Sequence, residues 1–100
     1  MTSAIRRQEP TPTDPQDTVT AQIVRLETAT ETMAEYIGYL TNEILNEEDQ
    51  AQPNAARIRA LQAQLDAVLD EKHSITSDNQ DLIAKALYIY APIMKALDAS

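Results

Sequence analysis

Apolar side chains recur at alternating steps of four and three residues through the first half of this chain. With one threonine among them, they are Val19, Ile23, Leu26, Thr30, Met33, Ile37, Leu40 and Ile44. Because an α-helix turns once in about 3.6 residues, this spacing gathers them into one narrow stripe, here called the seam. A narrow seam has to meet another helix, so the chain is expected to pack helices within itself or against a partner.

The composition favours helices along the whole chain. Its 100 residues fit one domain, and they include one Gly, no Phe and no Trp. Ala, Leu, Gln and Glu are abundant and β-branched runs are absent, which predicts an all-α fold with an aliphatic core. A core of this size is adequate but small, so self-association would be a natural supplement.

Two segments are expected, a flexible N-terminal arm at 1–14 and a single helical domain at 15–100. Pro10 and Pro12 oppose helix formation in the arm. The first helix is predicted for about 15–48, with Asp14 as its cap and Pro15 in its first turn. A helix of that length spans roughly 50 Å.

Two further helices follow. One is predicted for about 53–73, because apolar residues again recur at steps of three and four; they are Ile58, Leu61, Leu65 and Val68. The other is predicted for about 78–98, starting from a Ser77–Gln80 capping box or from the competing pair Asp78 and Asp81. Pro92 lies inside this last helix and is expected to kink or break it at 88–92.

The unequal helix lengths predict an uncovered end. In an antiparallel hairpin, the second helix would return only to about residue 28 of the first, and the third would turn back from there. The expected architecture is therefore a long-helix antiparallel hairpin plus a third kinked helix, resembling a coiled-coil bundle. The exposed first half of the long helix then predicts self-association through Val19, Ile23, Leu26 and Met33. The alternative is a break at 28–32 that folds 15–28 back as a fourth helix.

A second candidate surface lies further along the first helix. It combines two tyrosines that share a side of the helix with four acids at its C-terminal end: Tyr36, Tyr39, Glu43, Glu47, Glu48 and Asp49. Tyrosine is favoured at interfaces, and carboxylates at the C-terminal end of a helix oppose the helix dipole. Tyr88 and Tyr90 are expected to join the first two in one cluster, and Arg57 is expected to pair with the acids. A closed core margin and a solvated helix end are the alternatives.

Several classes of function are disfavoured. The chain has no Cys, one His and one Gly, so thiolate metal sites, metal clusters, nucleophile triads and phosphate-binding glycine loops are not expected. No cofactor and no catalytic residue is predicted. Sixteen acidic and eight basic residues give a net charge of −8, which repels nucleic acid. No apolar run approaches a membrane span, and a cytoplasmic location is the default expectation.

The sequence predicts a non-enzymatic protein that acts through protein–protein interaction and self-association, of an adaptor, co-chaperone or assembly type. Its expected shape, a small acidic helical hairpin with an extra helix, is similar to that of many small co-chaperones and phage or plasmid accessory proteins, without a motif that transfers a residue role. One alternative is an acidic inhibitor, of the antitoxin, immunity or phage counter-defence type, that blocks a basic nucleic-acid-binding surface of its partner. Another is a small-ligand binder at a subunit interface near the tyrosines.

Overall fold

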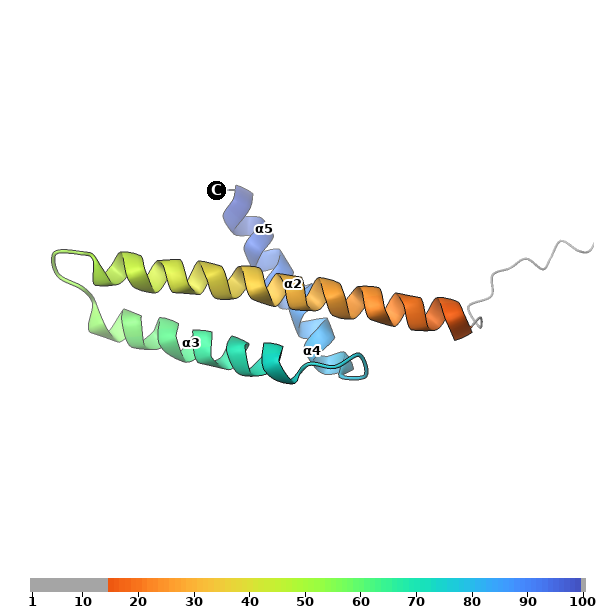
Figure 1. Cartoon of the computed structure of the whole chain (residues 1–100). Coiled ribbons are helices and arrows are strands. Elements are labelled where there is room, and N and C mark those ends of the chain that lie inside the picture. Colours follow the sequence, from red (N-terminus) through yellow and green to blue (C-terminus); the bar gives the residue numbers. More distant parts are fainter. Residues whose placement is uncertain (1–14, 100) are drawn as a thin grey trace, which may run out of the picture.

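The computed structural model describes residues 15–99, and within that range it is helical with no strand (Figure 1). The elements are α2 (Pro15–Glu48), α3 (Ala55–Ser74), α4 (Gln80–Lys85), the π-helical turn η1 (Ala86–Tyr90) and α5 (Ala91–Ala99). The all-α prediction is therefore confirmed. The predicted arm at 1–14 and its cap Asp14 lie outside the described residues.

Helix α2 is continuous over 34 residues, Pro15–Glu48, as the seam predicted. The alternative of a break at 28–32 is wrong, and the hydroxyl of Thr30 is satisfied within the helix. It donates to the backbone carbonyls of Leu26 at 3.1 Å and Glu27 at 3.0 Å, so the threonine satisfies its polar group inside the helix. The N-terminal part of α2 consequently stays in line with the rest.

Helix α3 runs back along α2 in the opposite direction (Figure 1). Its N-cap is Asn54, whose side-chain oxygen accepts a hydrogen bond from the backbone N–H of Arg57 at 3.1 Å. Asparagine is among the strongest N-cap residues, so the helix starts at Ala55, two residues after the predicted start at Pro53. The helix ends at Ser74, one residue beyond the prediction.

The third helical segment also starts from an asparagine. The side chain of Asn79 accepts from the backbone N–H of Leu82 at 3.2 Å, so neither predicted cap at Ser77 or Asp78 is correct. Those residues are used inside the preceding turn. The backbone carbonyl of Ser77 accepts a hydrogen bond from the side-chain amide of Gln80 at 3.0 Å. The Asp78 carboxylate accepts one from the Thr76 hydroxyl at 2.5 Å.

The disturbance predicted near Pro92 is a π-helical turn. Its defining bond runs from the backbone N–H of Ala91 to the carbonyl of Ala86, five residues earlier. Proline has no N–H, and its ring crowds the carbonyl four residues before it, here that of Tyr88. A local widening of the helix relieves this conflict. The helix does not end there, since α5 continues directly from Ala91.

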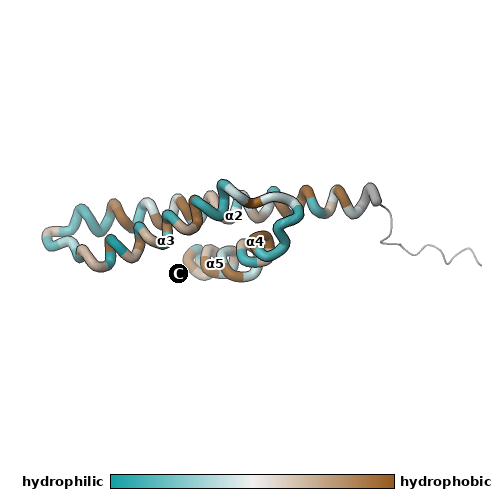
Figure 2. The backbone as a smooth tube through the Cα atoms, turned by 90° about the horizontal axis from the view of Figure 1, so that it is seen from below, coloured by the Kyte–Doolittle hydropathy of each residue, from teal (hydrophilic) through white to brown (hydrophobic). Residues whose placement is uncertain are grey.

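The core lies where α3 and the α4–η1–α5 segment meet α2. Figure 2 shows α3 alongside α2, while α4 and α5 cross on one side of the pair. The central cluster comprises Ala29, Met33, Tyr36, Leu40, Val68, Ile83, Ala86 and Tyr90. Because the last segment crosses α2 steeply instead of running along it, contact on that side is limited to a short stretch of the long helix (Figure 1).

Substitution of Met33 tests this assignment of the core, because the Met33 side chain is 0% exposed. We expect Met33→Ala to lower the free energy of unfolding by about 2–5 kcal/mol, since the surrounding helices cannot collapse fully into the space left. Urea denaturation followed by circular dichroism, at the lowest practical protein concentration, measures the effect. Leu45→Ala is the control, because Leu45 is 56% exposed and its truncation should change stability by no more than about 0.5 kcal/mol. Equal effects would contradict the described core.

Candidate interaction surface

The N-terminal part of α2 projects beyond the end of α3, and Figure 1 shows it in orange. We call residues 18–28 of α2 the projecting segment. Val19, Ile23 and Val24 in it are 53%, 49% and 53% exposed, whereas Ala29 is 0% exposed. The change from exposed to buried therefore falls at residue 29, close to the limit that the helix lengths predicted.

The four residues predicted for self-association occupy different places. Val19 and Ile23 are exposed, and Leu26 is partly covered. Met33 lies in the core, so the structure removes it from the exposed stripe. The reason is that η1 also packs against α2, which buries side chains on a second side of the long helix from Ala29 onward. Val24 was not part of the seam, and it adds apolar surface beside it.

The projecting segment is electrically neutral within an acidic chain. Its only charged residues are Arg25 and Glu27, and their charges cancel, while the whole chain carries −8. The remaining polar residues of the segment are Thr18, Thr20, Gln22 and Thr28. The projecting segment itself therefore adds little electrostatic repulsion against another copy of the chain.

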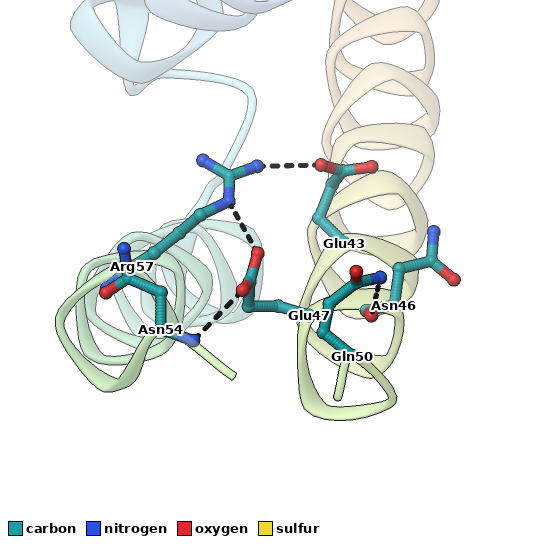
Figure 3. Close-up of polar contacts among 6 residues, drawn as sticks. All are labelled: Glu43, Asn46, Glu47, Gln50, Asn54 and Arg57. Carbon is teal, nitrogen blue, oxygen red and sulfur yellow. Dashed lines mark hydrogen bonds and ion pairs between the residues drawn. The ribbon is translucent and has the colours of Figure 1, made fainter. Parts of the chain in front are cut away.

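The acids at the other end of α2 are partly used inside the chain (Figure 3). Arg57 of α3 pairs with Glu43 at 2.8 Å and with Glu47 at 3.3 Å, which confirms the expected contact. The second oxygen of Glu47 accepts a hydrogen bond from the backbone N–H of Asn54 at 3.0 Å. Glu47 thus bridges the turn between the helices and holds the start of α3.

This arrangement changes the predicted acidic surface. Glu43 and Glu47 each have a basic partner and are partly covered, whereas Glu48 and Asp49 are exposed. The Arg57 side chain is itself 48% exposed, so the pair adds little stability, at most about 1 kcal/mol. Its clearer role is to fix the geometry of the hairpin turn.

Three of the four tyrosines form the expected cluster. The rings of Tyr36 and Tyr39 are nearly parallel with centroids 6.3 Å apart, and Tyr36 lies 4.9 Å from Tyr90. Tyr36 and Tyr90 are 8% and 2% exposed, so they belong to the core. Tyr88 was expected to join them and does not, because it is 68% exposed. Residues two apart on a helix point to nearly opposite sides.

Glu71 is a central residue that the sequence analysis did not single out. Its carboxylate accepts hydrogen bonds from the Tyr90 hydroxyl and from the Lys85 ammonium, both at 2.5 Å. The Glu71 side chain is only 16% exposed. A signal was present, because Glu71 lies three residues after Val68 and four before Ile75, which continues the spacing of the apolar residues in this helix.

The contacts with Glu71 shift two pKa values. Hydrogen bonding to Glu71 is the main cause that raises the pKa of Lys85, because the carboxylate favours the protonated amine. Burial is the main cause that raises the pKa of Tyr90, and the bond to Glu71 adds to it. Burial also raises the pKa of Tyr36, with the nearby Tyr39 as a second cause. All three groups therefore hold their protons more tightly in the fold.

A second exposed apolar patch was also missed. It lies on the outer side of η1 and α5, where Tyr88, Ile89 and Ile93 are 68%, 52% and 37% exposed. The steep crossing of η1 and α5 over α2 leaves this side of the segment uncovered.

Within residues 15–99, no three His, Asp or Glu side chains are grouped so that they could hold a metal ion. None of the helices in that range is both long enough and apolar enough to cross a membrane. Comparison with known proteins found no matching family model, no matching curated protein and no matching solved structure. The case for a function therefore depends on the surfaces described above.

The raised pKa values predict a loss of stability in alkali. Neutral Tyr36 and Tyr90 and protonated Lys85 are favoured by the fold, so their contributions are complete below about pH 10 and decline as the pH rises through the raised pKa values. Tyr90→Phe removes one of these groups and should make the decline of the melting temperature above about pH 9 less steep. At neutral pH the same variant should lose about 1–3 kcal/mol, because the bond to Glu71 is lost.

Thermal unfolding at closely spaced pH values measures both effects of Tyr90→Phe. Tyr88→Phe is the matched control, because Tyr88 is 68% exposed and its substitution should leave the stability at neutral pH unchanged. A Tyr90→Phe variant as stable as the wild type, with the same alkaline slope, would show that the Tyr90–Glu71 bond is not formed.

Proposed function

We propose that this protein acts through protein–protein contact without catalysing a reaction, and that it associates with a second copy of itself through the projecting segment of α2. The observation that carries the proposal is the exposure of Val19, Ile23 and Val24 on a helix end that nothing in the described chain covers. Grouped apolar side chains of this kind mark association surfaces.

The pattern of the seam supports a helix as the binding element. From Met33 to Ile44 the seam packs inside the chain, and the same spacing continues through Leu26, Ile23 and Val19 beyond the end of α3. In one half of α2 the seam packs against a helix of the same chain. The same spacing in the other half is therefore suited to pack against another helix. The neutral charge of the projecting segment supports a second copy as the source of that helix.

The expected association is modest. The uncovered part of the seam spans about three helical turns, and a helix pair of that length buries less surface than interfaces that form stable dimers. We therefore expect a monomer–dimer equilibrium that depends on concentration in the micromolar range. An adaptor or assembly protein that forms and releases contacts is compatible with such an affinity.

An acidic inhibitor is a second candidate, supported by the exposed Glu48 and Asp49 beside the hairpin turn and by the charge of −8. Its support is weaker, because Glu43 and Glu47 are already paired with Arg57. Binding of this type would weaken steeply with salt, whereas apolar pairing of the seam would change little. The hypothesis of a ligand site at the tyrosines has less support, since Tyr36 and Tyr90 are packed in the core.

The first test is the double substitution Ile23→Glu with Leu26→Glu. It places two charges in the uncovered seam, so it should prevent dimer formation while the helix content stays close to that of the wild type. Light scattering from low micromolar to near-millimolar concentration, at low and high salt, measures the mass.

The control for that experiment is Ala21→Glu with Thr28→Glu. Both residues are exposed and lie seven apart on the side of α2 opposite the seam, so this variant adds the same charge without entering the stripe. We expect it to associate like the wild type. A wild-type mass for the seam variant, or a monomer at every concentration for the wild-type protein, would contradict the proposal.

A further inference from the structure

The structure also indicates how two copies would be oriented. We infer that the projecting segments pair antiparallel, so that the α2 helix of the second copy continues the line of α3 along the uncovered seam. This inference rests on the proposed self-association and adds its direction. It follows from the space around α2 and from the positions of charged groups.

Helix α3 already fills the space along one half of α2. This helix has 20 residues and lies antiparallel to α2, so at equal rise it covers α2 from Glu48 back to about residue 29. Beyond that point the same side of α2 is open, as the exposed Val19 and Ile23 show. A second antiparallel helix can occupy the open part, and the rest of its chain then lies past the N-terminal end of the first α2.

A parallel pair conflicts with the same contacts. Its two seams would face each other along their whole length, yet Met33 and Leu40 are already 0% and 2% exposed inside each chain. The α3 helices of both copies would meet between the two α2 helices, which are each about 10–12 Å wide. The long helices would have to separate sharply just after the paired segment, although α2 is one continuous helix.

The types of residue in the seam favour the parallel orientation in two-stranded coiled coils. Every second seam position is β-branched, at Ile23, Thr30, Ile37 and Ile44, a choice typical of parallel two-stranded coils. In this fold, however, Ile44 is buried within the chain and Ile37 packs against its core. Of these four residues only Ile23 lies in the projecting segment, so the available space decides the orientation.

Charge separation gives a second, independent argument. The exposed Glu48 and Asp49 lie at the hairpin turn, at the far end of α2 from the projecting segment. A parallel pair would bring two such acidic turns to the same end. An antiparallel pair places them at opposite ends of the assembly, much further apart than the screening length of about 8 Å in physiological salt.

Spin-label distances test the orientation directly, because the chain has no Cys and single-cysteine variants label cleanly. Leu45→Cys places a label on an exposed residue near the turn, and Ala21→Cys places one on the outer side of the projecting segment. In the antiparallel pair the two Leu45 labels should be about 60–70 Å apart along the axis, and the Ala21 labels much closer. In a parallel pair both distances would be short, well below about 50 Å.

The outcomes separate the two proposals. A short Leu45 distance together with a short Ala21 distance would overturn the orientation and leave self-association standing. No dipolar signal from Ala21→Cys, with a monomeric mass for the unlabelled wild type, would overturn both. Small-angle X-ray scattering of the unlabelled protein provides a check that labels cannot disturb: a long, narrow dimer agrees with antiparallel pairing, and a compact or forked dimer contradicts it.

Discussion

The contact between α2 and α3 determines most of this structure, because the two helices differ so much in length. With 34 residues against 20, α3 can cover only part of the seam, and the remainder stays in solvent. Helices that stand alone are marginal in water, so the projecting segment depends on the packed half of α2 to hold it in register. A partner helix would therefore gain buried apolar surface and also stabilise the least supported part of the fold.

The Glu71 network determines how the rest of the chain meets this hairpin. Glu71 stands near the end of α3, Lys85 ends α4 and Tyr90 ends η1, so one carboxylate ties three elements together. Lys85 also lies over the Tyr90 ring, 5.5 Å from its centroid. Because the Glu71 carboxylate is only 16% exposed and binds both side chains, this contact fixes the crossing segment against α3. The exposed patch at Tyr88 and Ile89 follows from that placement.

The sequence predicted what depends on local spacing and failed where distant segments meet. The extent of α2 and the position of the hairpin turn follow from periodicity, capping residues and Pro53, and they were found within two residues. The partners of Glu71 could not be found that way, although its spacing from Val68 and Ile75 indicates an inward position, because Lys85 and Tyr90 lie 14 and 19 residues away. Tyr88 failed for another reason: it is two residues from Tyr90 within η1, so it points to nearly the opposite side of the helix and cannot share a cluster with it.

Charge and apolar surface are kept apart along α2, and this separation limits how the chain can associate. A surface with a net charge of −8 opposes unspecific contact between copies, because most approaches bring like charges together. The projecting segment is the exception, since Arg25 and Glu27 cancel beside exposed Val19 and Ile23. Approach through this end combines apolar gain with little repulsion, and approach through the turn at Glu48 and Asp49 combines repulsion with little apolar gain. The charge pattern thus favours the same end of the molecule that the unequal helix lengths leave uncovered.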